Sequence, residues 1–219
     1  MDMKNKQKFD EEFLNSLIRH NVANKLQIIE GYLGLIKREE IPEDKRKFLD
    51  GAHESAISAS NLIRTARSLL SKDIELHPIK IDELIKPIVN EYQSIAERRN
   101  MEIEYNELYA TVVGHEILGS AFSNLIENSI KHSNGSILKI YGNEKEKHYV
   151  VSFEDDGIGI PESEREKIFE RGIKGKNSHG TGFGTYAANL IVKKVGGRIE
   201  LNEGELNGAK FDVYLIRAN

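Results

Sequence analysis

Four short motifs follow one another between Asn124 and Gly184, and they are the most informative part of the sequence. They are Asn124-Leu-Ile-Glu-Asn-Ser-Ile-Lys-His132, Asp155-Asp-Gly-Ile-Gly159, Phe169-Glu-Arg-Gly172 and Gly180-Thr-Gly-Phe-Gly184. Each motif alone says little, since Asp-Gly and Gly-x-Gly are ordinary turn signals. Together and in this order, they indicate one nucleotide site.

The first motif gathers polar side chains on one side of a predicted helix. Asn124, Glu127, Asn128 and Lys131 recur at helical spacing, although apolar residues surround them. A phosphate-bound magnesium ion prefers hard oxygen ligands, and an amide oxygen is one. The alternative is an ordinary solvated helix face.

The four motifs resemble the N, G1, F and G2 boxes of the histidine-kinase ATPase domain, a member of the Bergerat-fold (GHKL) superfamily. This resemblance implies a site for ATP and Mg²⁺. It makes Asn128 the principal magnesium ligand, Asn124 a second candidate ligand and Lys131 a phosphate contact. His132 stands where the family often has an aromatic residue near the nucleotide.

The second motif supplies the expected adenine contact. A carboxylate only accepts hydrogen bonds and the exocyclic amine of adenine donates them, so a buried Asp155 would select adenine over guanine. Gly157 and Gly159 permit close approach of the backbone and positive φ. We expect Asp156 to face solvent or to serve the turn. A plain turn between strand and helix is the alternative for the whole motif.

Residues 170–182 are rich in charge and glycine, and they resemble the mobile lid that closes over ATP. Lys174 aligns best with the lid cation of the family. The last motif leads into a predicted helix, so its backbone N–H groups can meet phosphate at the positive end of that helix. The residues expected to bind there are Gly180, Thr181, Gly182, Phe183 and Gly184.

The N-terminal third of the chain has a helical pattern. Apolar spacing predicts two long helices within residues 9–70, separated by a loop at residues 39–44. The second helix is expected to bury a face made of Phe48, Ala52, Ala56, Ala59, Ile63, Ala66 and Leu70. A homodimeric four-helix bundle would bury both stripes. The alternative is a helical hairpin packed on its own C-terminal domain. Residues 71–80 are expected to be a linker because Pro78 disfavours helix before it.

Beyond the linker, strand-like and helix-like segments alternate, which predicts an α/β sandwich and not a Rossmann fold. Strands are expected at 79–81, 101–105, 111–113, 136–142, 148–154, 198–201 and 210–216, with a turn at 143–147. Helices are expected at 82–99 with Asp82 as the cap, and at 115–131, 162–170 and 183–195. The predicted class is therefore α+β, with a helical hairpin followed by a Bergerat-type sandwich.

His20 is the candidate phosphoacceptor. It lies on the first predicted helix, on an otherwise apolar seam, with the polar Asn24 one turn later. Neutral imidazole can attack a phosphoryl group. The family commonly has an acid directly after this histidine, whereas this chain has Asn21, whose amide orients the ring but accepts no charge. Asn24 stands where many of these kinases position water, so we expect a phosphatase-biased bifunctional enzyme. His53, on the second helix, fits no phosphoacceptor pattern as well.

The resemblance covers nearly the whole chain. It implies a dimerisation and histidine-phosphotransfer domain at 1–73 and a catalytic ATP-binding domain at 78–219. The expected function is a protein-histidine kinase that exchanges phosphate with an aspartate of a response regulator receiver domain. The alternatives are a GHKL ATPase that drives conformational change, with Glu127 as its base, and a non-enzymatic dimeric phosphotransfer scaffold.

Composition excludes several other classes. The net charge of −4 provides no basic field for nucleic acid, and the absence of cysteine excludes disulfides, thiolate metal sites and a cysteine nucleophile. No apolar run approaches the roughly 20 residues that span a bilayer, and the start lacks a signal-peptide core. We therefore expect a cytoplasmic chain without membrane contact of its own. A membrane-bound sensor outside these residues remains open.

Overall fold

The computed structural model describes residues 28–29, 42–70, 74–170 and 182–218. The chain divides into two compact units, Met1–Ser71 and Lys72–Asn219, and the division falls inside the predicted linker. None of the described helices combines the length and apolarity that a membrane crossing needs.

The described part of the first unit consists mainly of helix α2, Glu43–Leu70. The carbonyl of Pro42 accepts the amide of Lys45 at 3.0 Å, which closes the first turn. Of the face predicted to be buried, Ala52, Ala59 and Ala66 are buried. Ile63 and Leu70 are exposed in the single chain, and their burial in a dimer stays a prediction. In their place, small polar residues are buried: Ser55, Ser58, Asn61, Thr65 and Ser68.

The second unit is built on a five-stranded sheet in the order β2-β4-β5-β7-β6. Its strands are β2 Glu102–Tyr105, β4 Ile137–Lys145, β5 His148–Asp155, β6 Arg198–Asn202 and β7 Lys210–Ile216. The β2–β4 pair is parallel and the other pairs are antiparallel. A separate antiparallel pair joins β1 His77–Lys80 to β3 Thr111–Gly114.

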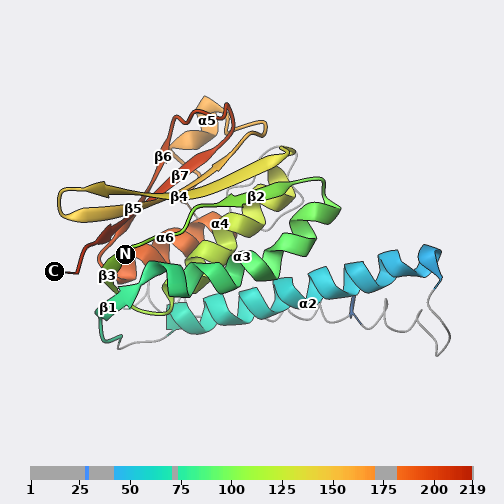
Figure 1. The fold of residues 1–219 in the computed structure, drawn as a ribbon, viewed down its shortest axis with the longest axis horizontal. Coiled ribbons are helices and arrows are strands. Elements are labelled where there is room, and N and C mark those ends of the chain that lie inside the picture. Colours follow the sequence, from blue (N-terminus) through green and yellow to red (C-terminus); the bar gives the residue numbers. More distant parts are fainter. Residues whose placement is uncertain (1–27, 30–41, 71–73, 171–181, 219) are drawn as a thin grey trace, which may run out of the picture. The chain divides into compact units, whose positions relative to one another are not determined.

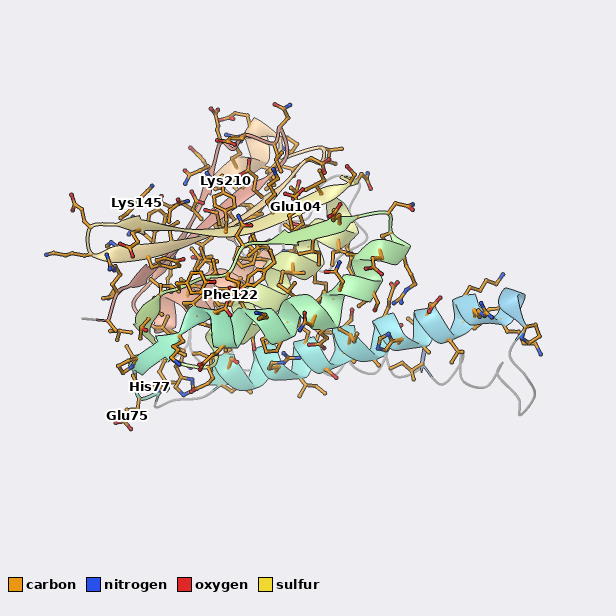
Figure 2. The ribbon with its side chains drawn as sticks, viewed as in Figure 1. Glu75, His77, Glu104, Phe122, Lys145 and Lys210 are labelled. Atoms are coloured by element: carbon orange, nitrogen blue, oxygen red, sulfur yellow. The ribbon has the colours of Figure 1, made fainter. Side chains whose placement is uncertain are left out.

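Three helices cover one face of this sheet: α3 Ile81–Arg98, α4 Leu118–His132 and α6 Gly184–Lys194 (Figure 1). A fourth helix, α5 Glu162–Arg165, is short. Phe122 of α4 meets Phe153 of β5 in the core, with ring centroids 5.7 Å apart. Figure 2 shows Phe122 on the helix side of the sheet and Lys210 on the other side. The predicted α/β sandwich is thereby confirmed.

Alternation along β5 sets which residues reach the site. Val151 and Phe153 are fully buried on the helix side, and Asp155 continues that series at the end of the strand. Ser152 and Glu154 point to the opposite face of the sheet, yet both are also buried. β5 therefore ends with two buried carboxylates that face opposite ways.

Several predicted boundaries were wrong. The second half of the predicted linker forms β1, because residues 77–80 pair with β3. The predicted turn at 143–147 is mostly strand, since β4 continues to Lys145 and β5 begins at His148. Only Glu146, with φ of 36°, and Lys147 form the connection. The predicted helix at 162–170 ends at Arg165, whereas β7 matches its prediction.

Asp82 does not cap α3. The helix begins at Ile81 with Lys80 in the cap position, so that Asp82 lies inside the first turn. Its carboxylate accepts the amide of Leu108 at 3.0 Å and the hydroxyl of Tyr105. Asp82 thus ties the β2–β3 connection to α3, because these donors satisfy it better than the amides of its own helix.

Candidate nucleotide site

Asp155 lies at the C-terminal end of β5, where three elements meet its carboxylate. Oδ1 accepts the amides of Gly157 and Ala209, each at 3.1 Å, and Oδ2 accepts the hydroxyl of Ser129 at 3.1 Å. The residue is 3% exposed. The sequence predicted Asp155 and Gly157, but not Ser129 of α4 or Ala209 before β7. One feature of the sequence could have indicated Ser129, because this residue directly follows Asn128 within the first motif.

Burial raises the pKa of the Asp155 carboxyl above its usual value. Hydrogen bonds from Ala209, Gly157 and Ser129 act in the opposite direction, and the nearby charge of Asp156 adds to the rise. The charged form is thus costly here. A further donor such as an exocyclic amine would stabilise it.

Glycines let the surrounding loops approach Asp155. A Cβ on Gly157 would overlap the backbone of Ser133, and one on Gly208 would overlap Asp155 itself. Gly159 has φ of +66°, the left-handed region that other residues rarely adopt. Gly157 and Gly159 were predicted, whereas Gly208 was missed because only the β5–β7 pairing brings it here.

Of the two roles expected for Asp156, facing solvent or serving the turn, the structure shows the second. Asp156 accepts the amide and hydroxyl of Ser136, each at 2.6 Å, and the amide of Ile137 at 2.8 Å. Partial burial acts to raise its pKa, but these hydrogen bonds outweigh it and leave the pKa below the usual value. Asp156 therefore anchors the start of β4.

Asn128 joins α4 to the start of α6. Its Nδ2 donates to Oγ1 of Thr185 at 3.0 Å. A Cβ on Gly184 would lie 2.9 Å from the Asn128 Oδ1, so the glycine leaves room beside the amide oxygen. Asn124, one turn earlier on α4, is 6% exposed. The donor set fits Mg²⁺, because an amide oxygen in an open cradle suits a cation that takes its other ligands from phosphate and water.

Lys131 forms an ion pair with Glu127 one turn before it, and both side chains are partly buried. The hydroxyl of Tyr92 on α3 donates to the other oxygen of Glu127 at 3.3 Å. His132 follows at the exposed end of α4. Surrounding protein atoms and the charge of Lys131 hold the pKa of His132 below its usual value. Glu127 therefore neutralises Lys131 at the C-terminal end of α4.

The last motif is described from Gly182 onward. Gly182 has φ of 65°, and Gly184 is the first residue of α6. Phe183 is 4% exposed, with its ring 6.2 Å from that of Tyr186. Its side chain therefore anchors the motif in the core, and only its backbone remains for a ligand. The ring of Phe169, from the third motif, lies 6.3 Å from that of Phe211 at the start of β7.

Six of the predicted site residues lie outside the described residues. They are His20, Asn21, Asn24, Lys174, Gly180 and Thr181.

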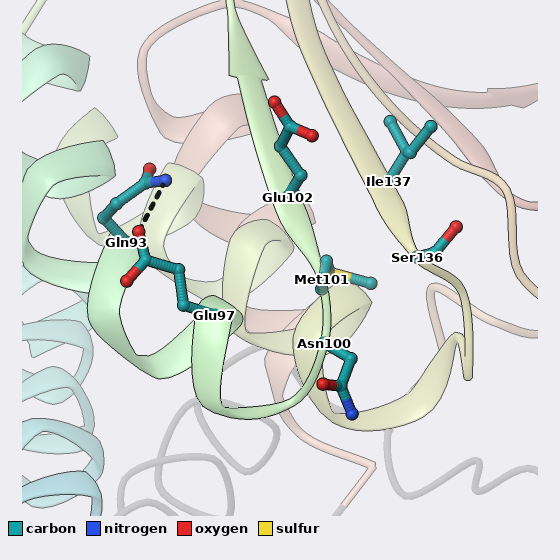
Figure 3. Close-up of a pocket in the computed structure, with 7 residues that line it drawn as sticks. All are labelled: Gln93, Glu97, Asn100, Met101, Glu102, Ser136 and Ile137. Carbon is teal, nitrogen blue, oxygen red and sulfur yellow. Dashed lines mark hydrogen bonds between the residues drawn. The ribbon is translucent and has the colours of Figure 1, made fainter.

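An open hollow of about 610 Å³ lies where α3 ends and β2 begins, and neither Asp155 nor Asn128 lines it (Figure 3). The contact within it that Figure 3 marks joins Nε2 of Gln93 to Oε1 of Glu97 at 3.4 Å. None of the predicted site residues lines it. Its walls are Gln93, Glu97, Asn100, Met101, Glu102, Ser136 and Ile137.

Comparison with known proteins agrees with this geometry. Residues 115–219 match the family described as histidine kinase-, DNA gyrase B-, and HSP90-like ATPase. Sensor protein CitS of Halalkalibacterium halodurans is 32% identical over 197 residues, which cover 88% of this chain and 34% of CitS. Sensor histidine kinase YclK of Bacillus subtilis is 26% identical over 214 residues, covering 90% of this chain and 45% of YclK. The chain thus spans less than half the length of these relatives.

Solved structures show the same architecture. The catalytic domain of histidine kinase ThkA aligns with a TM-score of 0.57 and 25% identity, over 66% of this chain and 97% of that domain. Full-length ShkA aligns with a TM-score of 0.61 over 100% of this chain and 47% of ShkA, at 17% identity, which bears on the fold alone. Residues 115–219 are therefore an ATPase domain of the histidine kinase-, DNA gyrase B- and HSP90-like family, and the chain as a whole is similar to parts of sensor histidine kinases.

Proposed function

We propose that this chain is an ATP-dependent protein-histidine kinase core that phosphorylates its own His20 and exchanges the phosphoryl group with an aspartate of a response regulator receiver domain. The observation that supports the proposal is a chain of contacts through α4: Ser129 donates to Asp155 of β5, and its neighbour Asn128 donates to Thr185 of α6. The sensor kinase names of the relatives support the same reading.

Different residues bind the adenine, the magnesium ion and the phosphates of ATP. Asp155 accepts the adenine amine on Oδ2, while its Oδ1 stays with the two backbone amides. Asn128, with Asn124 as a second candidate ligand, holds Mg²⁺, which neutralises phosphate charge when bound. Lys131 leaves its ion pair with Glu127 and binds a phosphate oxygen of ATP. Lys174 closes over the phosphates from the lid.

The phosphoryl transfer proceeds from ATP to imidazole. Nε2 of His20 attacks the γ-phosphorus, the bond from that phosphorus to the bridging oxygen breaks, and ADP leaves with the electron pair. The phosphohistidine then passes its phosphoryl group to a carboxylate oxygen of the receiver aspartate and becomes free imidazole. Asn21 orients Nδ1–H without accepting charge, so the first step is slow.

Dephosphorylation of the regulator uses a different neighbour of His20. The amide of Asn24, one turn along the same helix face, holds a water in line with the phosphoaspartate. The chain is therefore biased towards phosphatase activity. Two copies pair through residues 1–73 into a four-helix bundle, because two long helices alone leave apolar residues exposed to water.

One experiment distinguishes the proposal from its two alternatives. The chain is incubated with γ-labelled ATP and Mg²⁺, and the protein-bound label is tested for stability in acid and in base. Label that is lost in acid and kept in base supports phosphohistidine. Free phosphate without protein-bound label would favour a GHKL ATPase, and no turnover at all would favour a scaffold.

A further inference from the structure

Glu154 is a buried carboxylate next to Asp155 that the proposed chemistry does not use. It is 2% exposed, although it lies on the face of the sheet opposite to the helices. Oε2 accepts the hydroxyl of Tyr141 on β4 at 2.6 Å, and Oε1 accepts the amide of Leu206 at 2.7 Å. Burial acts to raise its pKa, but the bonds from Tyr141 and the loop amides, with the charge of Lys210, leave the pKa below its usual value. The carboxylate is therefore held charged by its partners.

Leu206 belongs to the connection between β6 and β7, residues 203–209, which we call the β6–β7 loop. Two consecutive carboxylates of β5 hold this loop from opposite faces of the sheet. Glu154 binds its middle through Leu206, and Gly204 lies so close that a Cβ there would overlap the carboxylate. Asp155 binds its end through the amide of Ala209. The loop is thus fixed at two points by neighbouring residues of one strand.

Packing contributes little to the middle of this loop. Glu205 is exposed, Leu206 is only partly buried, and a hollow of about 200 Å³ lies beside them. Lys139 and Tyr141 line that hollow together with Glu154. Without an apolar core under it, the loop depends on hydrogen bonds for its position. The far end of the same loop lies close to the site, because a Cβ on Gly208 would overlap Asp155 and a Cβ on Gly159 would lie 3.5 Å from the Gly208 carbonyl oxygen.

We propose that Glu154 is a positioning residue of the nucleotide site, which acts by anchoring the β6–β7 loop so that Gly208 and Ala209 hold the Asp155 carboxylate in place. This inference rests on the proposed function, because it assumes that Asp155 binds adenine. Glu154 faces the side of the sheet opposite to Asp155, so in this proposal it is not itself a contact of the nucleotide. Its contribution is to the orientation of Asp155.

The test compares three variants of the full chain by calorimetric titration with ATP and Mg²⁺. Glu154→Leu removes both bonds and should weaken ATP binding on the order of tenfold, below the roughly 10²-fold that a 1 Å displacement can cost. Glu154→Gln should bind like the wild type, because its carbonyl still accepts Leu206 and the Tyr141 hydroxyl can turn to accept its amine.

Asp212→Leu is the matched control, since Asp212 is also a buried carboxylate on the same face. It accepts Ser152 at 2.6 Å and Asn202 at 2.8 Å, and both partners belong to strands. It should lower the urea midpoint of unfolding, as Glu154→Leu also should, yet keep wild-type ATP affinity. Equal losses of ATP affinity in the two leucine variants would reduce Glu154 to a structural role and overturn the inference.

Gly204→Ala keeps the test decisive if Glu154→Leu does not fold. The added methyl displaces the exposed loop from the carboxylate while every hydrogen-bonding side chain stays, so ATP affinity should fall as in Glu154→Leu. Hydrogen exchange at the Leu206 amide should speed up in both variants and remain slow in Asp212→Leu. If Gly204→Ala shows fast exchange at the Leu206 amide but binds ATP like the wild type, the inference about Glu154 is wrong and the proposed function is unaffected. A wild-type chain that does not bind ATP would instead overturn the proposed function.

Discussion

Replacing Asp155 by asparagine separates the adenine contact from the fold. Oδ1 of Asp155 faces two backbone donors, Gly157 and Ala209, so an asparagine at 155 should keep its carbonyl oxygen there. Its amine then takes the place of Oδ2. The Ser129 hydroxyl can turn and accept this amine, but the exocyclic amine of adenine cannot, because two donors would meet.

The magnitude follows from the type of bond that is lost. A hydrogen bond to a charged acceptor contributes about 1.5–3 kcal/mol, which corresponds to a loss of ATP affinity of about 12- to 140-fold. The free energy of unfolding should change by about 1 kcal/mol or less, since the amide keeps the internal bonds and removes a costly buried charge.

Calorimetric titration with ATP and Mg²⁺ measures the affinity, and urea denaturation measures the stability. Asp156→Asn is the matched control, because Asp156 carries the same group one residue later but binds Ser136 and Ile137. That variant should keep wild-type affinity. Equal ATP affinity in Asp155→Asn and wild type would refute the assignment of Asp155 to the base.

Four further predictions concern the pH dependence of Asp155 and the N-terminal region of the chain. Acidification from neutral pH should weaken ATP binding, because burial raises the pKa of Asp155 and the protonated carboxyl no longer offers Oδ2 as an acceptor. The same raised pKa means that protonation of Asp155 favours the folded state. Calorimetry should therefore show a loss of ATP affinity without unfolding caused by this group. Light scattering at micromolar concentration should give the mass of a dimer, and a monomer would contradict the bundle of residues 1–73. Asn21→Asp should speed phosphorylation of His20 by up to about 10²–10⁴-fold, the usual range for general-base help, in a labelled-ATP time course. Asn24→Ala should chiefly slow release of phosphate from the regulator, and an equal loss in both steps would contradict their separation.

Local patterns in the sequence predicted the parts of the fold that local physics determines. β7 was predicted with its observed bounds because Phe211, Val213 and Leu215 recur at every second position. The helix with Asn124 and Asn128 was found because both its apolar and its polar residues recur at helical spacing. Strand ends were less predictable. The polar residues Asn143 and Glu144 suggest a turn, but pairing with β5 extends β4 through them.

The site was predicted where a motif carries its residues and missed where the partner comes from far along the chain. Asp155 and Gly157 belong to one motif, so their relation is visible in the sequence. Ala209 and Gly208 reach Asp155 only because β7 lies next to β5, and the strand order cannot be deduced from composition or spacing. The same holds for Glu154, whose partner Leu206 is 52 positions away.

Comparing His20→Gln with His53→Gln shows whether His20 receives the phosphoryl group from ATP. His53 is an exposed histidine of α2, so its replacement controls for loss of a helical histidine. Both variants are incubated with γ-labelled ATP and Mg²⁺, and acid-labile label on the protein is measured. We predict that His53→Gln is labelled like the wild type and that His20→Gln carries no label. Acid-labile label that persists in His20→Gln would contradict the account.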